Sequence, residues 1–158
     1  TGLKETQFNL ENKTIFILGA GGVVPSIIYA LEKLGTPKII VSNRTKQKTE
    51  NLKKYFSNIS VVDWGDQPEF DMIINATSLG LNKRDNIGLN FKNMNKTKLF
   101  YDVIYNPKET NFLRTGKNLG CQVSNGKMMF IYQAFEAFML WHKVKPEINE
   151  ELKKFLDL

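Results

Sequence analysis

The sequence has 158 residues, of which 42% are hydrophobic and 24% charged, a composition typical of one globular domain. No apolar stretch approaches the ~20 residues that a membrane span requires, so we expect no membrane partner. A single cysteine, Cys121, excludes an internal disulfide, and a single histidine, His142, excludes a multi-histidine metal site. We therefore predict a cytoplasmic protein without a bound metal.

The chain is basic, with 22 lysine and arginine residues against 16 acidic ones and a formal net charge of +6. Such a charge suits nucleic acid, anionic lipid or a phosphorylated ligand, and it also suits a merely solubilising surface. The basic residues are dispersed, and no exposed aromatic series accompanies them as in nucleic-acid binders. We therefore expect no nucleic-acid partner. The sequence carries no signal for an oligomeric state.

Short apolar, β-branched runs alternate with segments of helical spacing along the chain. We predict strands at residues 14–18, 38–41, 59–62, 72–74, 99–103 and 121–123, and helices at 23–34, about 46–56, 127–141 and about 148–156. Alternation of this kind is typical of β-α-β units and a parallel sheet. The predicted fold is a doubly wound α/β domain, with a mostly parallel sheet and helices on both faces.

The run Gly19-Ala20-Gly21-Gly22 stands between the first predicted strand and its helix. Glycine at 19 permits a tight turn, and glycine at 21 lets the backbone approach a pyrophosphate, towards which the helix N-terminus points its amides. The third glycine of the usual fingerprint is absent, because Val24 occupies its place. We predict a Rossmann-like dinucleotide site here. A tight turn without a ligand is the alternative.

The residues after the second predicted strand favour NADP over NAD. An NAD-binding protein places Asp or Glu about 20 residues after the glycines, whereas this chain has Ser42-Asn43-Arg44-Thr45 there. Arg44 can pair with a 2′-phosphate, and Thr45 is placed to cap the next helix and to donate to the same phosphate. The alternative is an ordinary basic first turn, which is disfavoured because Lys46 and Lys48 oppose the helix dipole unless an anion offsets them.

Polar residues also follow the later strands, at the edge where such sheets bind ligands. The stretch Asn75–Gly80 either forms a turn or contacts the second ribose of the cofactor. Tyr105 is either a core tyrosine with a wet hydroxyl or a group that faces substrate. Gln133 lies on an apolar helix, where a buried glutamine needs a hydrogen-bonding partner in the protein or in a ligand. No nucleophile–base arrangement is visible, and we expect Cys121 to pack within a short buried strand.

Together these motifs resemble the C-terminal, NADP-binding domain of the shikimate dehydrogenase family, enzymes that reduce 3-dehydroshikimate to shikimate with NADPH. The resemblance rests on five ordered stretches, Gly19–Gly22, Asn43–Thr45, Asp71–Ser78, Tyr101–Pro107 and Asn125–Phe135. It implies a Rossmann fold over residues 1–158, NADP as the cofactor, and C-terminal helices that pack near a substrate domain. The small-molecule partner that it implies, shikimate or 3-dehydroshikimate, would be shared with that N-terminal domain.

The resemblance also implies a role for individual residues. The pyrophosphate residues would be Gly19, Ala20, Gly21, Gly22 and Val23; the residues at the 2′-phosphate end Asn43, Arg44, Thr45 and Lys48; and further cofactor contacts Thr77, Val103, Gly126 and Met129. Tyr105 and Gln133 would line the shikimate pocket. Two departures affect the seating of the cofactor, because Val24-Pro25 replaces a small-then-basic pair and Lys127-Met128 replaces an apolar residue and a glycine.

Nothing in the chain matches the catalytic Lys–Asp pair of the family, which lies in the N-terminal substrate domain. Gly2 matches the glycine that shortly follows this aspartate, so we expect the chain to be one domain of a two-domain enzyme that binds NADP(H) but lacks turnover by itself. The alternatives are a quinate/shikimate dehydrogenase paralogue that uses NAD, and a non-catalytic module that senses NADP(H).

Overall fold

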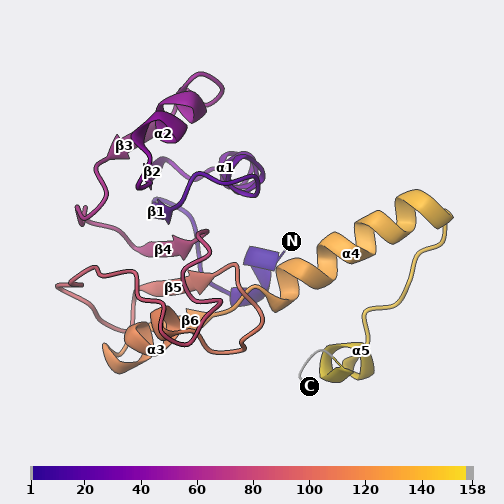
Figure 1. Ribbon diagram of the computed structural model, residues 1–158. Helices are drawn as coiled ribbons and strands as arrows, with labels where there is room; N and C mark the ends of the chain where they lie inside the picture. Colours follow the sequence, from indigo (N-terminus) through magenta and orange to yellow (C-terminus); the bar gives the residue numbers. More distant parts are fainter. Residues whose placement is uncertain (1, 156–158) are drawn as a thin grey trace.

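The computed structural model describes residues 2–155, which contain a six-stranded sheet with helices against it (Figure 1). The strands are β1 Thr14–Leu18, β2 Lys38–Ser42, β3 Ile59–Val62, β4 Met72–Asn75, β5 Leu99–Asp102 and β6 Gln122–Ser124. Every neighbouring pair is parallel, in the order β3-β2-β1-β4-β5-β6. The predicted doubly wound, Rossmann-like sheet is confirmed.

The helices lie on both sides of this sheet. They are the 3₁₀ helix η1 Gly2–Thr6 and the α-helices α1 Val24–Lys33, α2 Lys46–Lys53, α3 Asn111–Asn118, α4 Lys127–His142 and α5 Glu150–Phe155. Helices α1 and α2 contribute to the same core as Ile15 and Ile17 of β1, whereas α3 packs with Phe16 and Leu18 of the same strand. Each strand of the centre is thus covered on both faces, which explains its continuous apolar sequence.

Three of the helices differ from the sequence prediction by more than one residue at an end or were not predicted at all. Helix α3 was not predicted, because its residues are mostly polar and include Gly116 in the last turn. A Cβ at Gly116 would lie 2.6 Å from the Phe100 ring, so glycine is what lets α3 pack against the sheet. Helix α2 ends at Lys53, three residues before the predicted end at Phe56. The predicted last helix is shorter as well, and its expected residue 156 lies outside the described residues.

The prediction that Cys121 lies within a short buried strand is wrong. Cys121 precedes β6 and is partly buried, and β6 itself is an exposed strand at the edge of the sheet. The exposure follows from its place at the edge, because β6 has a neighbouring strand on one side only, and Gln122 and Val123 are both exposed.

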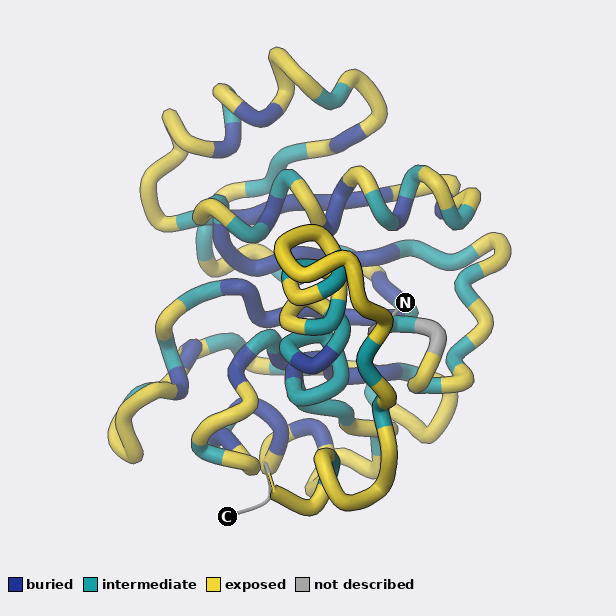
Figure 2. Tube along the Cα trace, turned by 90° about the vertical axis from the view of Figure 1, so that its right-hand side faces the viewer, coloured by how far each residue is buried: buried dark blue, intermediate teal, exposed yellow. Residues whose placement is uncertain are grey.

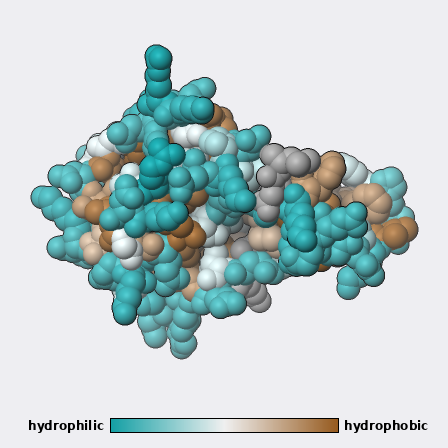
Figure 3. Space-filling model, turned by 90° about the horizontal axis from the view of Figure 1, so that it is seen from below, coloured by the Kyte–Doolittle hydropathy of each residue, from teal (hydrophilic) through white to brown (hydrophobic). Residues whose placement is uncertain are grey.

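Helix α4 projects away from the sheet and carries apolar side chains all round. Only Ile131 of its 16 residues is buried, and the outer turns, which point towards the viewer in Figure 2, are exposed. Leu140 and Trp141 are 66% and 78% exposed. Figure 3 shows hydrophobic surface on the lobe that α4 and α5 form. Among the described residues, no helix has both the length and the apolar character needed to cross a bilayer.

Candidate functional site

The glycine turn after β1 lies where the strand order reverses, between β2 on one side and β4 on the other. The amide of Gly19 donates to the Ser42 carbonyl oxygen at 2.7 Å. Its φ of +113° belongs to a backbone conformation that glycine adopts readily, and a Cβ there would lie 2.7 Å from the Ala76 carbonyl oxygen. Glycine at 19 therefore lets the end of β1 lie close to the ends of both β2 and β4. In open α/β sheets this switch point is where ligands bind.

The rest of the turn is open. Gly21 and Gly22 are exposed, and a Cβ built on either would meet nothing within 4 Å. Val23 is the N-cap of α1 and offers no side-chain cap, and Pro25 in the first turn has no N–H. No side chain thus stands between the backbone of the two glycines and the space in front of them, an arrangement that suits a bulky anion.

The segment after β2 differs from its prediction in two respects. Thr45 is the N-cap of α2, but its hydroxyl makes no capping hydrogen bond; Asn43 instead donates its side-chain amide to the Thr45 carbonyl oxygen at 2.9 Å. The Lys46 ammonium lies 2.8 Å from the Asp63 carboxylate, and this pairing raises the pKa of Lys46. An anion of the chain itself therefore offsets Lys46, so its charge is no argument for a ligand.

Arg44 and Lys48 of this segment are exposed to solvent as well. Within residues 2–155, neither makes an ion pair or a side-chain hydrogen bond. Both lie within six residues of the end of β2, at the same edge of the sheet as the glycine turn. Arg44 and Lys48 are therefore the two cations of this segment that are available to an incoming anion.

The loop after β4 is held by a buried pair, Asn75 and Asp102, which are paired residues of β4 and β5. The Asn75 amide nitrogen donates to Asp102 Oδ1 at 3.1 Å, and Asn75 Oδ1 accepts from the hydroxyl of Thr77 at 2.7 Å. The Thr77 hydroxyl also accepts from the Leu79 amide at 3.0 Å. Thr77, which the resemblance assigns to the cofactor, thus uses its hydroxyl within the loop, and its methyl group and one lone pair remain for a ligand.

The loop after β5 approaches the start of α4. A Cβ at Gly126 would overlap the Val103 carbonyl oxygen, and the Gly126 amide donates to the Ile104 carbonyl oxygen at 3.2 Å. The Tyr105 ring stacks on Phe130 of α4 with a centroid distance of 4.4 Å, and Tyr105 is 38% exposed. Tyr105 is therefore not a core tyrosine, and it lies on the surface with its ring fixed by Phe130.

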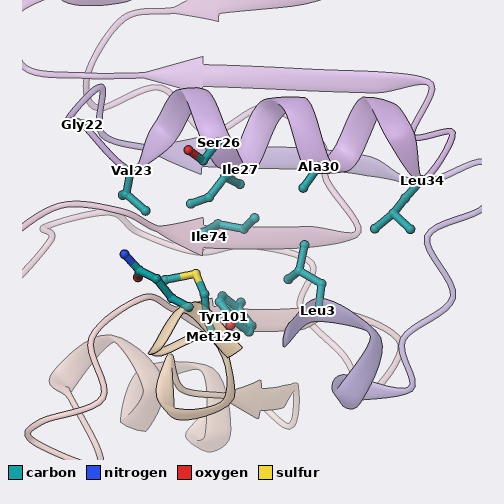
Figure 4. A pocket seen from close by; sticks show the side chains of 11 residues that line it. Leu3, Gly22, Val23, Ser26, Ile27, Ala30, Leu34, Ile74, Tyr101 and Met129 are labelled. Carbon is teal, nitrogen blue, oxygen red and sulfur yellow. The ribbon is translucent and has the colours of Figure 1, made fainter. Parts of the chain in front are cut away.

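Two hollows adjoin the glycine turn. One, about 560 Å³, runs between α1 on one side and η1 and the start of α4 on the other, over β4 and β5. In Figure 4, Val23 and Ser26 point into it from α1, and Tyr101 and Met129 from the opposite side. The other, about 610 Å³, lies between the turn and α2 and is lined by Lys48 and Tyr55 among others. Gly22 borders both hollows, so one continuous ligand could lie across the turn.

Gln133 lines the first hollow, but it is exposed rather than buried. The sequence argument for a buried glutamine that needs a partner was therefore wrong: on a helix that projects from the sheet, an apolar sequence does not imply burial. Among the predicted residues, the first hollow is thus lined by Gly22, Val23, Met129 and Gln133, and the second by Ala20, Gly21, Gly22 and Lys48.

Two buried ionisable groups lie beside the site without having been singled out from the sequence. Burial raises the pKa of Tyr101 to about 12, with a smaller contribution from the adjacent Asp102 carboxylate. Burial also raises the pKa of Asp102, and hydrogen bonds from Thr110, the Ile104 amide and Asn75 oppose that rise. Polar residues that end strongly apolar strands were the signal that could have identified them. Within residues 2–155, no cluster of three or more His, Cys, Asp or Glu side chains is arranged to hold a metal ion.

Comparison with known proteins agrees with this geometry. The family model described as shikimate / quinate 5-dehydrogenase matches residues 2–109. The shikimate dehydrogenase (NADP(+)) of Pelagibacter ubique is 54% identical over 156 residues, which cover 99% of this chain and 59% of that protein.

Two solved structures are also similar. The shikimate 5-dehydrogenase of Thermus thermophilus, in complex with NADP(H) and shikimate, is 30% identical with a TM-score of 0.79, over 92% of this chain and 55% of that one. The quinate dehydrogenase of Corynebacterium glutamicum, in complex with NAD, is 27% identical with a TM-score of 0.86, over 99% and 59%.

The matches cover almost all of this chain but only part of each relative. The chain spans between about half and three fifths of the length of the relatives named above. The family model alone matches more than half of the chain, including the glycine turn, both buried strand ends and Tyr105. The chain therefore belongs to the shikimate / quinate 5-dehydrogenase family.

Proposed function

We propose that this chain is the NADP(H)-binding domain of a shikimate dehydrogenase. The observation that carries the proposal is the glycine turn, which is open to an anion and lies between two hollows at the switch point of the sheet. A dinucleotide has this shape, with a pyrophosphate between two nucleoside halves. The relative from Pelagibacter ubique bears the name of an NADP(+) enzyme. The unpaired Cys121 agrees with a reducing compartment such as the cytoplasm.

The adenosine half fits the side of α2. Arg44 and Lys48 are exposed cations after β2, and a planar guanidinium recognises a phosphate through two parallel hydrogen bonds. No carboxylate stands at residues 42–48 to accept hydrogen bonds from a ribose 2′-hydroxyl. Asp63, whose carboxylate lies 2.8 Å from the Lys46 ammonium, is paired with that lysine. These features favour a 2′-phosphate over a 2′-hydroxyl and hence NADP over NAD.

The nicotinamide half fits the side of α4, where Val103, Gly126 and Met129 border the site. When bound, the nicotinamide would supply or accept a hydride at its C4 atom. Gly126 keeps the start of α4 close to the backbone of Val103. Tyr105, fixed by Phe130, and Gln133, exposed on α4, present a hydroxyl and an amide for the hydroxyl and carboxylate groups of shikimate.

The proton of the reacting hydroxyl would be handled by groups outside this chain. General acid–base work needs a titratable side chain within hydrogen-bonding reach of that proton. Tyr101 and Asp102 are buried, and nothing in the chain matches the catalytic Lys–Asp pair that the resemblance implies for the substrate domain. We therefore expect the chain by itself to bind NADP(H) and to show negligible oxidation of shikimate. A normal enzymatic rate from residues 1–158 alone would contradict this expectation.

The cofactor assignment is tested by titrating the chain with NADP⁺ and NAD⁺ in parallel by calorimetry, together with Arg44→Ala. We expect NADP⁺ to be preferred, and Arg44→Ala to weaken NADP⁺ by about 10- to 100-fold, the value of one charged hydrogen-bonding partner, while NAD⁺ changes little. Arg114→Ala, an exposed arginine on α3 against the other face of the sheet, is the matched control. Equal affinities for the two nucleotides, unaltered in Arg44→Ala, would refute the phosphate site and favour the NAD-using quinate alternative.

We also propose that α4 and α5 pack against the part of the polypeptide that the relatives have in addition. A helix that is apolar on every face is ordinarily buried, yet Trp141 of α4 is 78% exposed, and Phe155 of the neighbouring α5 is 70% exposed. With Trp64 replaced by phenylalanine, Trp141 remains as the sole tryptophan of residues 1–158. Its emission is expected at shorter wavelength in the full-length polypeptide than in residues 1–158. Identical emission in the two would contradict the packing.

A further inference from the structure

The buried pair Asn75 and Asp102 is more polar than packing of the sheet requires. The other residue pairs between β4 and β5 are apolar, such as Ile73 with Phe100. Asn75 and Asp102 are both 0% exposed at the ends of their strands. Within residues 2–155, no cation forms an ion pair with Asp102. Burying such a group is seldom the most stable choice, because an apolar pair of similar size avoids the cost of desolvation.

The hydrogen bonds of Asn75 are all used, and most of them lead into the loop after β4. Its amide nitrogen donates to the Leu79 carbonyl oxygen at 2.9 Å as well as to Asp102. Its amide oxygen accepts from the Thr77 amide at 3.1 Å and from the Thr77 hydroxyl at 2.7 Å. An amide side chain has two donors and two lone pairs, so this set is complete. Asn75 thereby fixes both Thr77 and Leu79.

Asp102 fixes the loop after β5 in the same way. Its Oδ1 atom accepts from the Ile104 amide at 3.0 Å in addition to Asn75, and its Oδ2 atom accepts from the Thr110 hydroxyl at 2.7 Å. The side chain therefore serves as an acceptor towards both loops. The two loops also touch directly, since a Cβ at Gly80 would lie 3.1 Å from both Ile104 and Thr110.

We infer that Asp102, through Asn75, is a positioning residue that holds the loop with Thr77 and the loop with Val103 and Tyr105 at a fixed separation. This inference rests on the proposed function, because those three residues are the ones assigned to cofactor and substrate. A carboxylate oxygen that accepts from both Asn75 and the Ile104 amide fixes direction as well as distance, which an apolar contact does not. The spacing between the cofactor and the substrate tyrosine is therefore set from beneath the site, by a group that touches neither.

The test compares Asp102→Leu, Asp102→Asn and Thr110→Val in the full-length polypeptide, by NADP⁺ affinity, by stability in urea and by hydrogen exchange of the Thr77 and Ile104 amides. Asp102→Leu is expected to weaken NADP⁺ by about tenfold or more and to speed exchange of both amides by a similar factor, since both loops lose their anchor. Asp102→Asn keeps an oxygen for Asn75 and Ile104 and is expected to retain affinity within about threefold.

Thr110→Val separates positioning from stability. It removes one hydrogen bond of the same carboxylate together with the cap of α3, where Thr110 accepts from the Leu113 amide, so it is expected to lower stability but to leave NADP⁺ affinity unchanged. Equal weakening by Thr110→Val and Asp102→Leu, or a folded Asp102→Leu with unchanged affinity and exchange, would overturn the inference. If Asp102→Leu does not fold, Asn75→Ala breaks the pair from the other strand and the same readouts decide. A parent protein that fails to bind NADP⁺ would refute the proposed function instead, and the exchange rates would still test the anchoring of the loops.

Discussion

Replacing Gly19 with alanine should lower the free energy of unfolding by about 2–4 kcal/mol, the sum of a left-handed backbone and an overpacked contact. Gly19 has a φ of +113°, and the added Cβ would lie 2.7 Å from the Ala76 carbonyl oxygen. Neither the backbone of β4 nor that of the turn can move without breaking sheet hydrogen bonds. Urea unfolding measures the loss directly.

Gly21→Ala provides the matched control, because it adds the same methyl group two residues further on. A Cβ at Gly21 meets nothing within 4 Å, so the stability is expected to stay within about 0.5 kcal/mol of the parent. The proposed pyrophosphate would approach the backbone at this residue, and we expect calorimetry to show an affinity for NADP⁺ lower by about tenfold or more. Unchanged NADP⁺ affinity in Gly21→Ala, or a loss of stability as large as that of Gly19→Ala, would contradict this division of roles.

The buried hydroxyl of Tyr101 should make the protein lose stability in alkali. Its pKa is raised to about 12, from 10.0 for an ordinary tyrosine. Between these values the unfolded chain releases the proton while the folded chain retains it, so stability is fully present below pH 10 and is lost as the pH rises towards 12. A difference of about two units corresponds to about 2–3 kcal/mol.

Tyr101→Phe isolates this contribution. Within residues 2–155 the hydroxyl has no hydrogen-bonding partner, so we expect the variant to be as stable as the parent at pH 7, or more stable by up to about 1 kcal/mol. Its stability should fall less than that of the parent between pH 10 and 12, by about 2–3 kcal/mol. Tyr55→Phe is the control, since Tyr55 is 81% exposed. Parallel curves for the parent and Tyr101→Phe in urea unfolding at each pH would refute the assignment.

The central strands could be predicted because they are buried on both faces. A run such as Thr14–Leu18 is apolar without interruption after its first residue, and five residues are too few for a typical α-helix, so a strand is the expected structure. Helix α3 could not be predicted by the same means. Glycine disfavours a helix, and Gly116 is accommodated because it packs against the ring of Phe100 on β5, a contact that the local sequence does not reveal. Its one local signal was Thr110, whose side chain accepts from the Leu113 amide as an N-cap does.

The geometry of the candidate site could be predicted where it depends on the local backbone. It could not be predicted where it depends on contacts between side chains that are distant in the sequence. The glycine turn follows from residues adjacent in sequence. Lys46, in contrast, is neutralised by Asp63, and no local pattern contains that contact. The expected cap by Thr45 failed because a favourable residue type does not fix a rotamer. Gln133 was expected to be buried because its helix is apolar. The exposure of α4 shows that an apolar helix sequence does not by itself establish that other residues of the chain cover the helix.

The hydrogen bonds around the glycine turn also determine when a nascent chain can first complete its proposed cofactor site. Gly19 donates to Ser42 at the end of β2, and Ala76 after β4 donates to Leu18 of β1. The turn is thus held by segments that are synthesised at widely separated times, and such non-local contacts form late. A ribosome-bound chain that ends before β4 contains the glycines but lacks Ala76, which packs against Gly19. Cofactor capture during synthesis must therefore wait until the first four strands have emerged and paired.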